Sequence, residues 1–371
     1  FSGENDIHIS TDWEMRLLTT DEIVFSFYND TINLTQIEIS PLADANDYYV
    51  RARYNGEFIS SDWSNQLDFY YNGNTFVLYS GSQDNTVKKI DSSGNQIWSF
   101  SLGTSSVFGV AIDSSGNVYS VSGNDNTVKK IDPDGNEVTS GGWPFTGHTD
   151  TIWGVAVDSN GNVYSGSYDS TVRKIDSDGN EVWSFTGHTD RVRNVAVDSN
   201  GNIYSASDDS TVRKINPDGT EVTSGGWPFT GHSNGVRSIV VDSNGYVYSG
   251  ALDGTVRKID SSGNQIWSFS LGTNSAHAVA VDSNGNVYSG SDGNTVKKID
   301  PDGNEVTSGG WPFTGHSDRV ETIVVDSNGN VYSGSYDSTV RKINPDGTEV
   351  TSGGWPFTEH SNYIRGLVVL G

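Results

Sequence analysis

The chain has 371 residues, of which 33% are apolar, 11% are aromatic and 43 are glycine, and its formal net charge is −25. This charge argues against nucleic acid or an anionic membrane as the main partner, and no run of 18 apolar residues could cross a bilayer as a helix. The absence of cysteine excludes disulfides, Cys-ligated zinc and thiol catalysis. Because the first residue is Phe1 rather than Met, we expect a processed, truncated or partial product.

The first 72 residues differ in pattern from the rest and are expected to form a separate module. Residues 49–53 read Tyr-Val-Arg-Ala-Arg, an alternation that predicts a strand. The surrounding segment DYYVRARYNGEFISSDWSN, residues 47–65, resembles part of a fibronectin type III domain, and HISTDWEM upstream resembles an earlier strand. This sequence is similar to those of fibronectin-like modules in phage tail fibres and bacterial surface proteins. The resemblance implies a small partial β-sandwich over residues 1–72, without its first strands.

From residue 73 onward one sequence repeat recurs, and each copy of the repeat contains a tyrosine at the same position. The spacings between these tyrosines are 40, 45, 40, 44, 40 and 44 residues. The seven are Tyr79, Tyr119, Tyr164, Tyr204, Tyr248, Tyr288 and Tyr332. A fixed period in this range, carried by short β-rich runs and Gly/Asp/Asn turns, is typical of a propeller blade.

Each copy contains four predicted strands, which we name a, b, c and d. In the third copy they are residues 152–158, 163–167, 171–176 and 181–185, joined by turns in which Gly accompanies Asp or Asn. Such turn residues tolerate positive φ, and β-branched and aromatic residues fill the strands between them.

The order of the strands predicts how the ring closes. Strand b occurs first, near residues 76–80, whereas the last strand a is residues 363–370. The C-terminal strand should therefore complete the blade formed by residues 76–100, leaving no free sheet edge. The predicted fold class is all-β, with a seven-bladed β-propeller over residues 73–371 and a composite closing blade.

The repeat resembles the WD-repeat family in its Gly-His, SGS-x-D and TVRKID segments, although Ile175 stands where that family has Trp. The resemblance implies a His–Asp pair in five blades: His148 with Asp169, His188 with Asp209, His232 with Asp253, His316 with Asp337, and His360 with Asp84. The phrase IDSDGNEVWSFTG also resembles quinoprotein-type repeats, and VAVDSNGNVYS resembles NHL-type repeats. A His beside an Asp could act as a general base, but five copies favour a repeated structural hydrogen bond.

Three further recurring features are interpreted as structural. One Trp per copy lies on strand d, as Trp183 does, and is expected to pack between blades; a sugar-stacking platform is the alternative. Basic dipeptides on strand c, such as Arg173-Lys174, should pair with acidic residues such as Glu181 rather than form a phosphate-binding face. The DSNG and DPDG turns lack the length and terminal Glu of a calcium loop, so we expect ordinary hairpin turns.

The copies disagree mainly at one end of each blade, where the d–a and b–c connections lie, which we call the top face. The aromatic and charged residues at these variable positions are the candidate ligand-binding residues: Phe108, Trp153, Tyr168, Arg191, Arg193, Arg237, His277, Arg319, Glu321, Tyr336, Tyr363 and Arg365. Arg, Trp and Tyr are enriched at binding hot spots; drift at exposed positions is the alternative. His277 and Glu321 are the only unique ionisable candidates for chemistry and have no evident partner in the sequence.

These features favour a non-catalytic recognition or adhesion module that binds a glycan or a protein through the top face. We expect it outside the cell, on a cell surface or on a virion, as part of a larger fibre or filament that adds avidity. No cofactor, metal site, nucleic-acid partner or membrane insertion is expected. The alternatives are an intracellular interaction scaffold and a quinoprotein-like propeller enzyme. Replacing Trp153 with Ala or Arg193 with Glu should abolish binding without changing the melting temperature.

Overall fold

The computed structural model describes residues 76–370 in full and, before them, the backbone of six strands. These are β1 (Ile7–His8), β2 (Asp12–Arg16), β3 (Ile23–Tyr28), β4 (Asn33–Pro41), β5 (Asp47–Tyr54) and β6 (Gln66–Asn72). They form a four-stranded antiparallel sheet in the order β1-β4-β5-β6 and a separate β2-β3 pair. The strand predicted at residues 49–53 lies within β5. The fibronectin-type interpretation of residues 1–72 depends on connections and side chains outside the described residues.

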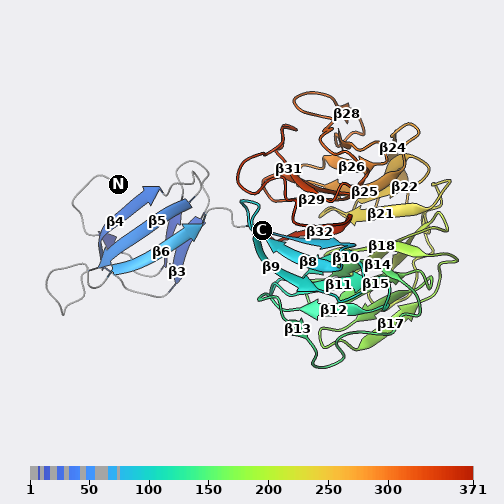
Figure 1. The fold of residues 1–371 in the computed structure, drawn as a ribbon, viewed down its shortest axis with the longest axis horizontal. Helices are drawn as coiled ribbons and strands as arrows, with labels where there is room; N and C mark the ends of the chain where they lie inside the picture. The colour runs from blue at the N-terminus through green and yellow to red at the C-terminus, as the bar shows by residue number, and fades with distance from the viewer. Residues whose placement is uncertain are drawn as a thin grey trace. The chain divides into compact units, whose positions relative to one another are not determined.

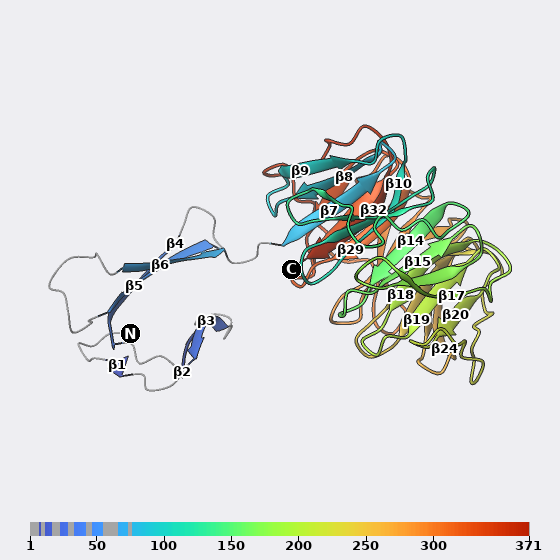
Figure 2. The same cartoon turned by 90° about the horizontal axis from the view of Figure 1, so that it is seen from below.

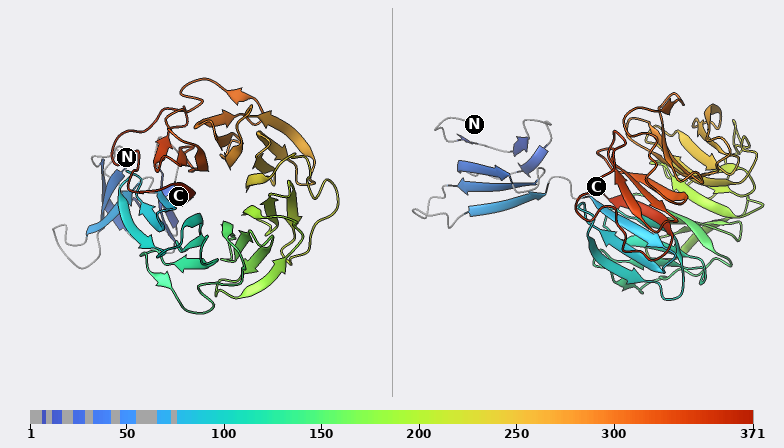
Figure 3. Two further views of the ribbon diagram at one scale, coloured as in Figure 1. Left: turned by 45° about the vertical axis from the view of Figure 1, so that its right-hand side comes forward. Right: turned by 45° about the horizontal axis from the view of Figure 1, so that its top comes forward.

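The chain divides into two compact units, Phe1–Thr75 and Phe76–Gly371, and the second unit is a seven-bladed β-propeller. Its seven antiparallel sheets surround a central axis (Figure 1; Figure 3, left). Each inner strand a contacts the inner strands of both neighbouring blades, so the ring is continuous. The inner strands are β10 (Val107–Ile112), β14 (Ile152–Val157), β18 (Val192–Val197), β21 (Val236–Val241), β25 (Ala276–Val281), β29 (Val320–Val325) and β32 (Ile364–Leu370).

The remaining strands follow outward in each blade. Strands b are β7 (Val77–Ser82), β11 (Val118–Ser122), β15 (Val163–Ser167), β19 (Ile203–Ser207), β22 (Val247–Ala251), β26 (Val287–Ser291) and β30 (Val331–Ser335). Strands c are β8 (Thr86–Ile90), β12 (Val128–Ile131), β16 (Val172–Ile175), β20 (Val212–Ile215), β23 (Thr255–Ile259), β27 (Val296–Ile299) and β31 (Val340–Ile343). Strands d are β9 (Gln96–Ser101), β13 (Glu137–Val138), β17 (Glu181–Phe185), β24 (Gln265–Ser270) and β28 (Glu305–Val306). The described part of the chain contains no helix that could span a membrane.

The closure of the ring is confirmed. Strand β32 pairs antiparallel with β7, from Ile364 opposite Ser82 to Leu370 opposite Val77, in the sheet β32-β7-β8-β9 (Figure 2). We call this sheet blade 1 and number the others in chain order. Because the two ends of the propeller share one sheet, separating them would break a full strand pairing.

The repeating tyrosine lies in the core between each blade and the next. All seven are at most 1% exposed, and each apolar cluster combines residues of two neighbouring blades. In blades 2 to 7 the tyrosine hydroxyl donates a hydrogen bond to the Asp of the a–b turn, as Tyr164 does to Asp158 at 2.9 Å. Asp158 also accepts the backbone N–H groups of Asn160 and Asn162, both at 2.9 Å, so it is occupied as a turn acceptor. This is the hairpin role expected for the repeated DSNG turns.

The prediction for strand d needs correction in the long copies. In the three copies in which this segment reads IWSF or VWSF, which we call short, strand d is continuous. In the four long copies, which read EVTSGGWPF, the strand is interrupted, leaving β13, β28 or isolated bridges such as Val212 with Phe229. The inserted Gly142 instead donates its N–H to the carbonyl of Asp178 in the next blade, at 2.7 Å. A Cβ at Gly142 would clash with the backbone of Gly179, so only glycine permits this approach.

The interpretation of the Trp residues as inter-blade packing groups is confirmed. Trp143 is 5% exposed and lies 5.4 Å from the ring of Tyr119. Its indole N–H donates to the carbonyl of Ser177 in the following blade at 3.2 Å. Trp183 makes the equivalent bond to Pro217 at 3.1 Å. The indole thus joins two sheets through both apolar area and a hydrogen bond.

The His–Asp pairs also form as structural bonds. In all five predicted pairs the His Nδ1 atom lies 2.7–3.0 Å from the Asp carboxylate. The Nε2 atom of the same ring bonds a buried serine of strand b, such as Ser165 with His148 at 2.8 Å. Ile175, in the position of the WD-family Trp, is fully buried in the apolar core.

The predicted acidic partners are found for the first residue of the basic dipeptides in five copies, whereas Lys88 and Arg257 contact Gln96 and Gln265 on strand d. The first residue contacts strand d, as Arg173 does with Glu181 at 2.5 Å. The second extends over the core tyrosine, with Lys174 Nζ 5.5 Å from the Tyr164 ring centroid. On strand c, therefore, each of Arg173, Arg213 and Arg341 faces one glutamate, and these sites are locally neutral.

Candidate functional site

Each inner strand begins with a β-bulge, and the bulges define a ring of side chains at the top face. In blade 3, Ile152 pairs with Ser167 and Gly154 with Gly166, so that Trp153 is the extra, unpaired residue. The same irregularity occurs at the same place in all seven blades. The seven extra residues, which we call the bulge ring, are Phe108, Trp153, Arg193, Arg237, His277, Glu321 and Arg365. A bulge redirects the side chain of its extra residue.

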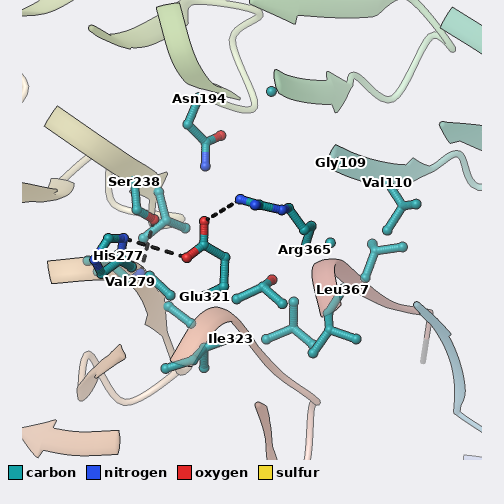
Figure 4. A pocket seen from close by; sticks show the side chains of 18 of the residues that line it. Gly109, Val110, Asn194, Ser238, His277, Val279, Glu321, Ile323, Arg365 and Leu367 are labelled. Atoms are coloured by element: carbon teal, nitrogen blue, oxygen red, sulfur yellow. Dashed lines mark hydrogen bonds and ion pairs between the residues drawn. The ribbon is translucent and has the colours of Figure 1, made fainter. Parts of the chain in front are cut away.

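The bulge ring surrounds the opening of the axial cavity. This cavity has a volume of about 390 Å3, and six of the seven ring residues line it, Arg193 being the exception. Beyond the ring, polar Asn194, Ser238 and Thr322 line the wall together with apolar residues of the inner strands (Figure 4). The cavity therefore has a charged and aromatic rim and a mixed polar and apolar wall.

The b–c turns add further side chains to the rim because they are bonded to the residues just before strand a. The N–H of Tyr168 donates to the carbonyl of Thr151 at 2.8 Å, and that of Tyr336 donates to Arg319 at 3.0 Å. Tyr363, from the last d–a connection, stacks on Tyr336 with ring centroids 4.1 Å apart. The variable residues of the bulge, of the b–c turn and of the segment just before strand a thus lie close together in space.

Aromatic rings and arginines alternate around one side of the rim. Trp153 stacks on Tyr168, with centroids 5.3 Å apart and planes 8° from parallel, and packs on Phe108 at 4.3 Å. The guanidinium of Arg193 lies 4.9 Å from the Trp153 ring and 4.3 Å from Tyr168. That of Arg365 lies 5.1 Å from Phe108, 5.0 Å from Trp153 and 4.8 Å from Tyr336. Such contacts attract cations to the ring faces and fix the direction of the guanidinium groups.

Two carboxylates at the rim are each shared by two arginines. Asp208 accepts hydrogen bonds from Arg193 Nε at 2.8 Å and Nη2 at 2.6 Å, and lies 3.9 Å from Arg237 Nε. Glu321 accepts a hydrogen bond from Arg365 Nη1 at 3.2 Å (Figure 4). It also lies 3.3 Å from Arg319 Nε. Unlike the one-to-one pairs of strand c, each of these arrangements has one more positive than negative charge.

His277 lies between two carboxylates. Its Nδ1 atom is 3.6 Å from Glu321 (Figure 4). Its Nε2 atom is 2.8 Å from Asp292. The expectation that His277 and Glu321 lack partners is therefore wrong. They are neighbours across two blades, a relation that depends on the ring closure and is invisible in the spacing of the sequence.

The electrostatic environment of the rim follows from burial and these pairs. Burial lowers the pKa of Arg193. Burial acts in the same direction on Arg319, but the charges of Glu321 and Asp292 and the contact with Tyr336 together raise the pKa of that guanidinium. Burial raises the pKa of the Tyr336 hydroxyl. Burial would raise the pKa of Asp292, but His277 and the hydrogen bonds from Ser275 together hold that pKa below its usual value.

Several polar atoms at the rim have no hydrogen-bond partner within residues 76–370. They are Arg237 Nε, Arg319 Nε, Arg365 Nε, Asp208 Oδ1 and Glu321 Oε2. Unpaired buried polar atoms are uncommon in native proteins and cost stability. Unpaired Nε atoms also occur in the strand-c arginines Arg173, Arg213 and Arg341, but among the described residues only the rim combines unpaired arginine nitrogens with unpaired carboxylate oxygens.

All twelve candidate residues lie in one connected cluster at the rim. Arg191 joins it through Tyr168, 4.6 Å from its guanidinium, and is exposed, whereas Arg193 is only 4% exposed. Replacing Arg193 with Glu would place a second carboxylate beside Asp208, so for that variant we now expect a lower melting temperature. The comparison of copies could have added Asp208 and Asn194, which also differ from their counterparts in other blades.

The family comparison agrees with this architecture. The profile of the quinoprotein-type family PQQ_2, described as "Outer membrane protein assembly factor BamB", matches residues 83–248 and 252–353. These segments together make up more than two thirds of the chain. No curated protein matches the chain. Of the three propeller families that the repeats resemble, the quinoprotein type is the one supported, and the chain belongs to this PQQ_2 family of β-propellers.

Proposed function

We propose that the propeller is a non-catalytic recognition module that binds a receptor glycan or protein at the bulge ring. One observation carries the proposal: seven bulges at equivalent positions carry side chains of five residue types, and six of these side chains line one cavity. The scaffold is repeated while the ring is not, which is the pattern expected when a regular fold carries one specific site.

The composition of the rim supports binding. Arg, Trp and Tyr contribute much of the energy of known interfaces, and here they are held against one another rather than extended into solvent. Preorganised side chains lose less conformational entropy when a ligand binds. The unpaired rim atoms would gain most from a ligand or from water that it retains.

We also propose that the module works outside the cytoplasm, at a cell or virion surface, without nucleic acid or an inserted membrane segment as its partner. The net charge of −25 disfavours polyanions as large partners. The family description refers to the assembly of outer-membrane proteins, which makes an envelope or surface location the consistent one.

The test compares two arginine variants for binding to arrays of glycans and of purified surface proteins. Arg237→Gln removes a rim arginine, whereas Arg213→Gln removes a strand-c arginine of similar burial that pairs with Glu221 at 2.6 Å. Arg237→Gln should weaken every specific interaction by at least about tenfold, the loss expected for one charge-assisted hydrogen bond. Arg213→Gln should bind as the unmodified protein does. Equal binding by both variants would contradict the proposal.

A quinoprotein-like enzyme is the second candidate, because His277 between Asp292 and Glu321 resembles an oriented general base. The arginine-rich rim would suit a quinone cofactor that carries carboxylates. Adding pyrroloquinoline quinone tests this candidate. A saturable change in its absorption spectrum that His277→Ala abolishes would favour the enzyme over the recognition module.

A further inference from the structure

We propose that the ligand of the bulge ring is an acidic sugar unit, whose carboxylate is held by Arg237 and Arg365. The inference rests on the proposed recognition function and narrows it to one chemical class. It depends on three features of the cavity: its charge balance, the way its arginines are held, and the polar side chains just beyond them.

The charge balance of the rim favours an anion. Asp208 is shared by Arg193 and Arg237, and Glu321 is shared by Arg319 and Arg365. The Asp208 cluster thus has one more positive than negative charge, whereas Asp292, bonded to His277, adds a second carboxylate near Glu321; the protein as a whole carries a net charge of −25. A ligand carboxylate would supply the missing charge, and guanidinium groups bind carboxylates with paired donors.

Arg237 is the clearest candidate for direct contact. It lines the cavity, is partly exposed, and makes no hydrogen bond to any residue between 76 and 370; its nearest carboxylate atom, Asp208 Oδ1, is 3.9 Å away. Its guanidinium donors therefore remain available. By contrast, Arg193 is buried and already bonds Asp208 through two nitrogens.

Arg365 is positioned for the same role from the other side of the opening. Three aromatic rings, Phe108, Trp153 and Tyr336, lie within 5.1 Å of its guanidinium carbon. Only its Nη1 atom bonds Glu321, so one terminal nitrogen remains for a ligand. Because guanidinium groups cover these aromatic faces, the rings orient arginines rather than offering a free platform for a neutral sugar.

The residues that follow the bulges provide a polar wall on one side only. In β18, β21 and β29 this position holds Asn194, Ser238 and Thr322, whereas in β32, β10 and β14 it holds glycine. Figure 4 shows the Asn194 amide directed into the space that Arg365 and Glu321 face. Ser238 accepts a hydrogen bond from the Val279 N–H at 3.0 Å, which leaves its own proton to donate.

These neutral polar groups suit the hydroxyl and amide substituents of a sugar ring. Within residues 76–370 the side chains of Asn194 and Thr322 make no hydrogen bond to other residues, so a ligand would not compete with existing partners. A cavity of about 390 Å3 is in the size range of small-molecule sites, roughly 300–1,000 Å3. The backbone amides of an acidic polypeptide could also bond this wall, so the test below includes such a polypeptide as a competing ligand.

The test uses an array of glycans that carry uronic or sialic acids, each printed beside its methyl-esterified counterpart, with polyglutamate as the acidic polypeptide. Esterification removes the negative charge and leaves the rest of the sugar unchanged. We expect binding to at least one acidic glycan, at least about tenfold weaker binding to its ester, and no comparable binding to polyglutamate. Arg237→Gln should reduce binding to the acidic glycan to the level of the ester, while Arg213→Gln should not.

Each other result has a distinct meaning. Equal binding of acid and ester, still lost in Arg237→Gln, would overturn the carboxylate assignment but leave recognition at the ring intact. Binding to polyglutamate as tight as to any glycan would replace the sugar with an acidic polypeptide. No binding to any acidic glycan would overturn the inference. Asn194→Ala provides a second check, because it should weaken glycan binding without altering the charge of the rim.

Discussion

At the scale of single residues, the repeated residues and the rim residues differ in how completely their polar atoms are hydrogen-bonded. Many repeated polar residues are fully paired: Tyr164 bonds the Asp158 turn, and His148 bonds both Ser165 and Asp169. The rim residues, in contrast, leave several atoms unpaired. Unpaired polar groups persist in native proteins where function rather than stability selects them.

The two blades that lack the histidine offer a direct test of the structural role of the His–Ser bond. Ser120 and Ser289 occupy the positions of Ser165 in blades 2 and 6, and their buried hydroxyl groups have no partner among the described residues. Ser165→Ala should lower the free energy of unfolding by about 1–3 kcal/mol, because it leaves Nε2 of His148 unpaired in the core. Ser120→Ala should leave it unchanged or raise it. Urea titration of both variants measures the difference.

If Ser120→Ala destabilised the protein as much as Ser165→Ala, the histidine bond would not explain the effect of the serine. Both side chains are fully buried, so the two variants lose the same area and volume. The histidine partner is the main difference between them.

Residue roles could be predicted where the copies agree and only partly where they differ. The five His–Asp pairs were predictable because a repeated pair implies a repeated contact. The contact of His277 with Glu321 was not predictable, because it joins residues of two blades and no other pair of neighbouring blades has the same two residues at these positions. The variable positions were identifiable, but not their partners.

At the scale of elements, the β-bulge is the feature that converts a repeated strand into a specific site. Alternation along strand a predicts which residues face the neighbouring sheet, but it does not reveal an extra residue. The bulge between Val192 and Asn194 places Arg193 out of register with the rest of its strand. Sequence pattern thus located the ring without explaining why its side chains gather at the cavity.

The interrupted strand d has a role in joining blades. In four junctions a glycine of the insertion faces a glycine of the next c–d turn, as Gly142 faces Gly179. In the other three junctions a Trp packs on that turn glycine, as Trp98 does on Gly135. Long and short copies of strand d therefore correspond to two kinds of contact between neighbouring blades, glycine against glycine and Trp against glycine.

A methyl group at the glycine junction should be costly. Gly142→Ala should lower the free energy of unfolding by about 1–3 kcal/mol, because its Cβ would overlap backbone atoms of Gly179 that cannot move independently. Thr139→Ala, an exposed change in the same insertion, should stay within about 0.5 kcal/mol of the unmodified protein. Chemical denaturation compares the two. Equal stabilities would show that the insertion does not hold the junction.

At the scale of the whole molecule, closure determines both stability and the site. Strand β32 completes blade 1 and also contributes Arg365 to the bulge ring. The pair His360–Asp84, at 2.8 Å, joins residues 276 positions apart in the sequence. The ring of blades and its closure could be predicted from counting strands, since seven copies of b and a displaced seventh copy of a admit one arrangement.

The protein as a whole is negatively charged, whereas arginines outnumber the paired carboxylates at the rim. A protein with 47 acidic and 22 basic residues presents five arginines around one opening, against the three carboxylates Asp208, Asp292 and Glu321. Composition alone would predict a surface that repels anions everywhere. Only the three-dimensional arrangement shows that these arginines gather around one opening.

Hydrogen–deuterium exchange of the propeller, with and without saturating amounts of the glycan that binds most strongly on the array, tests the recognition site most directly. Backbone amides exchange more slowly where a bound ligand stabilises local structure. The predicted result is protection of peptides that contain the bulges, above all those around Arg237, Glu321 and Arg365, with unchanged exchange in the outer strands and the a–b turns. Protection confined to the outer strands or to the a–b and c–d turns, with the bulges unaffected, would contradict recognition at the bulge ring.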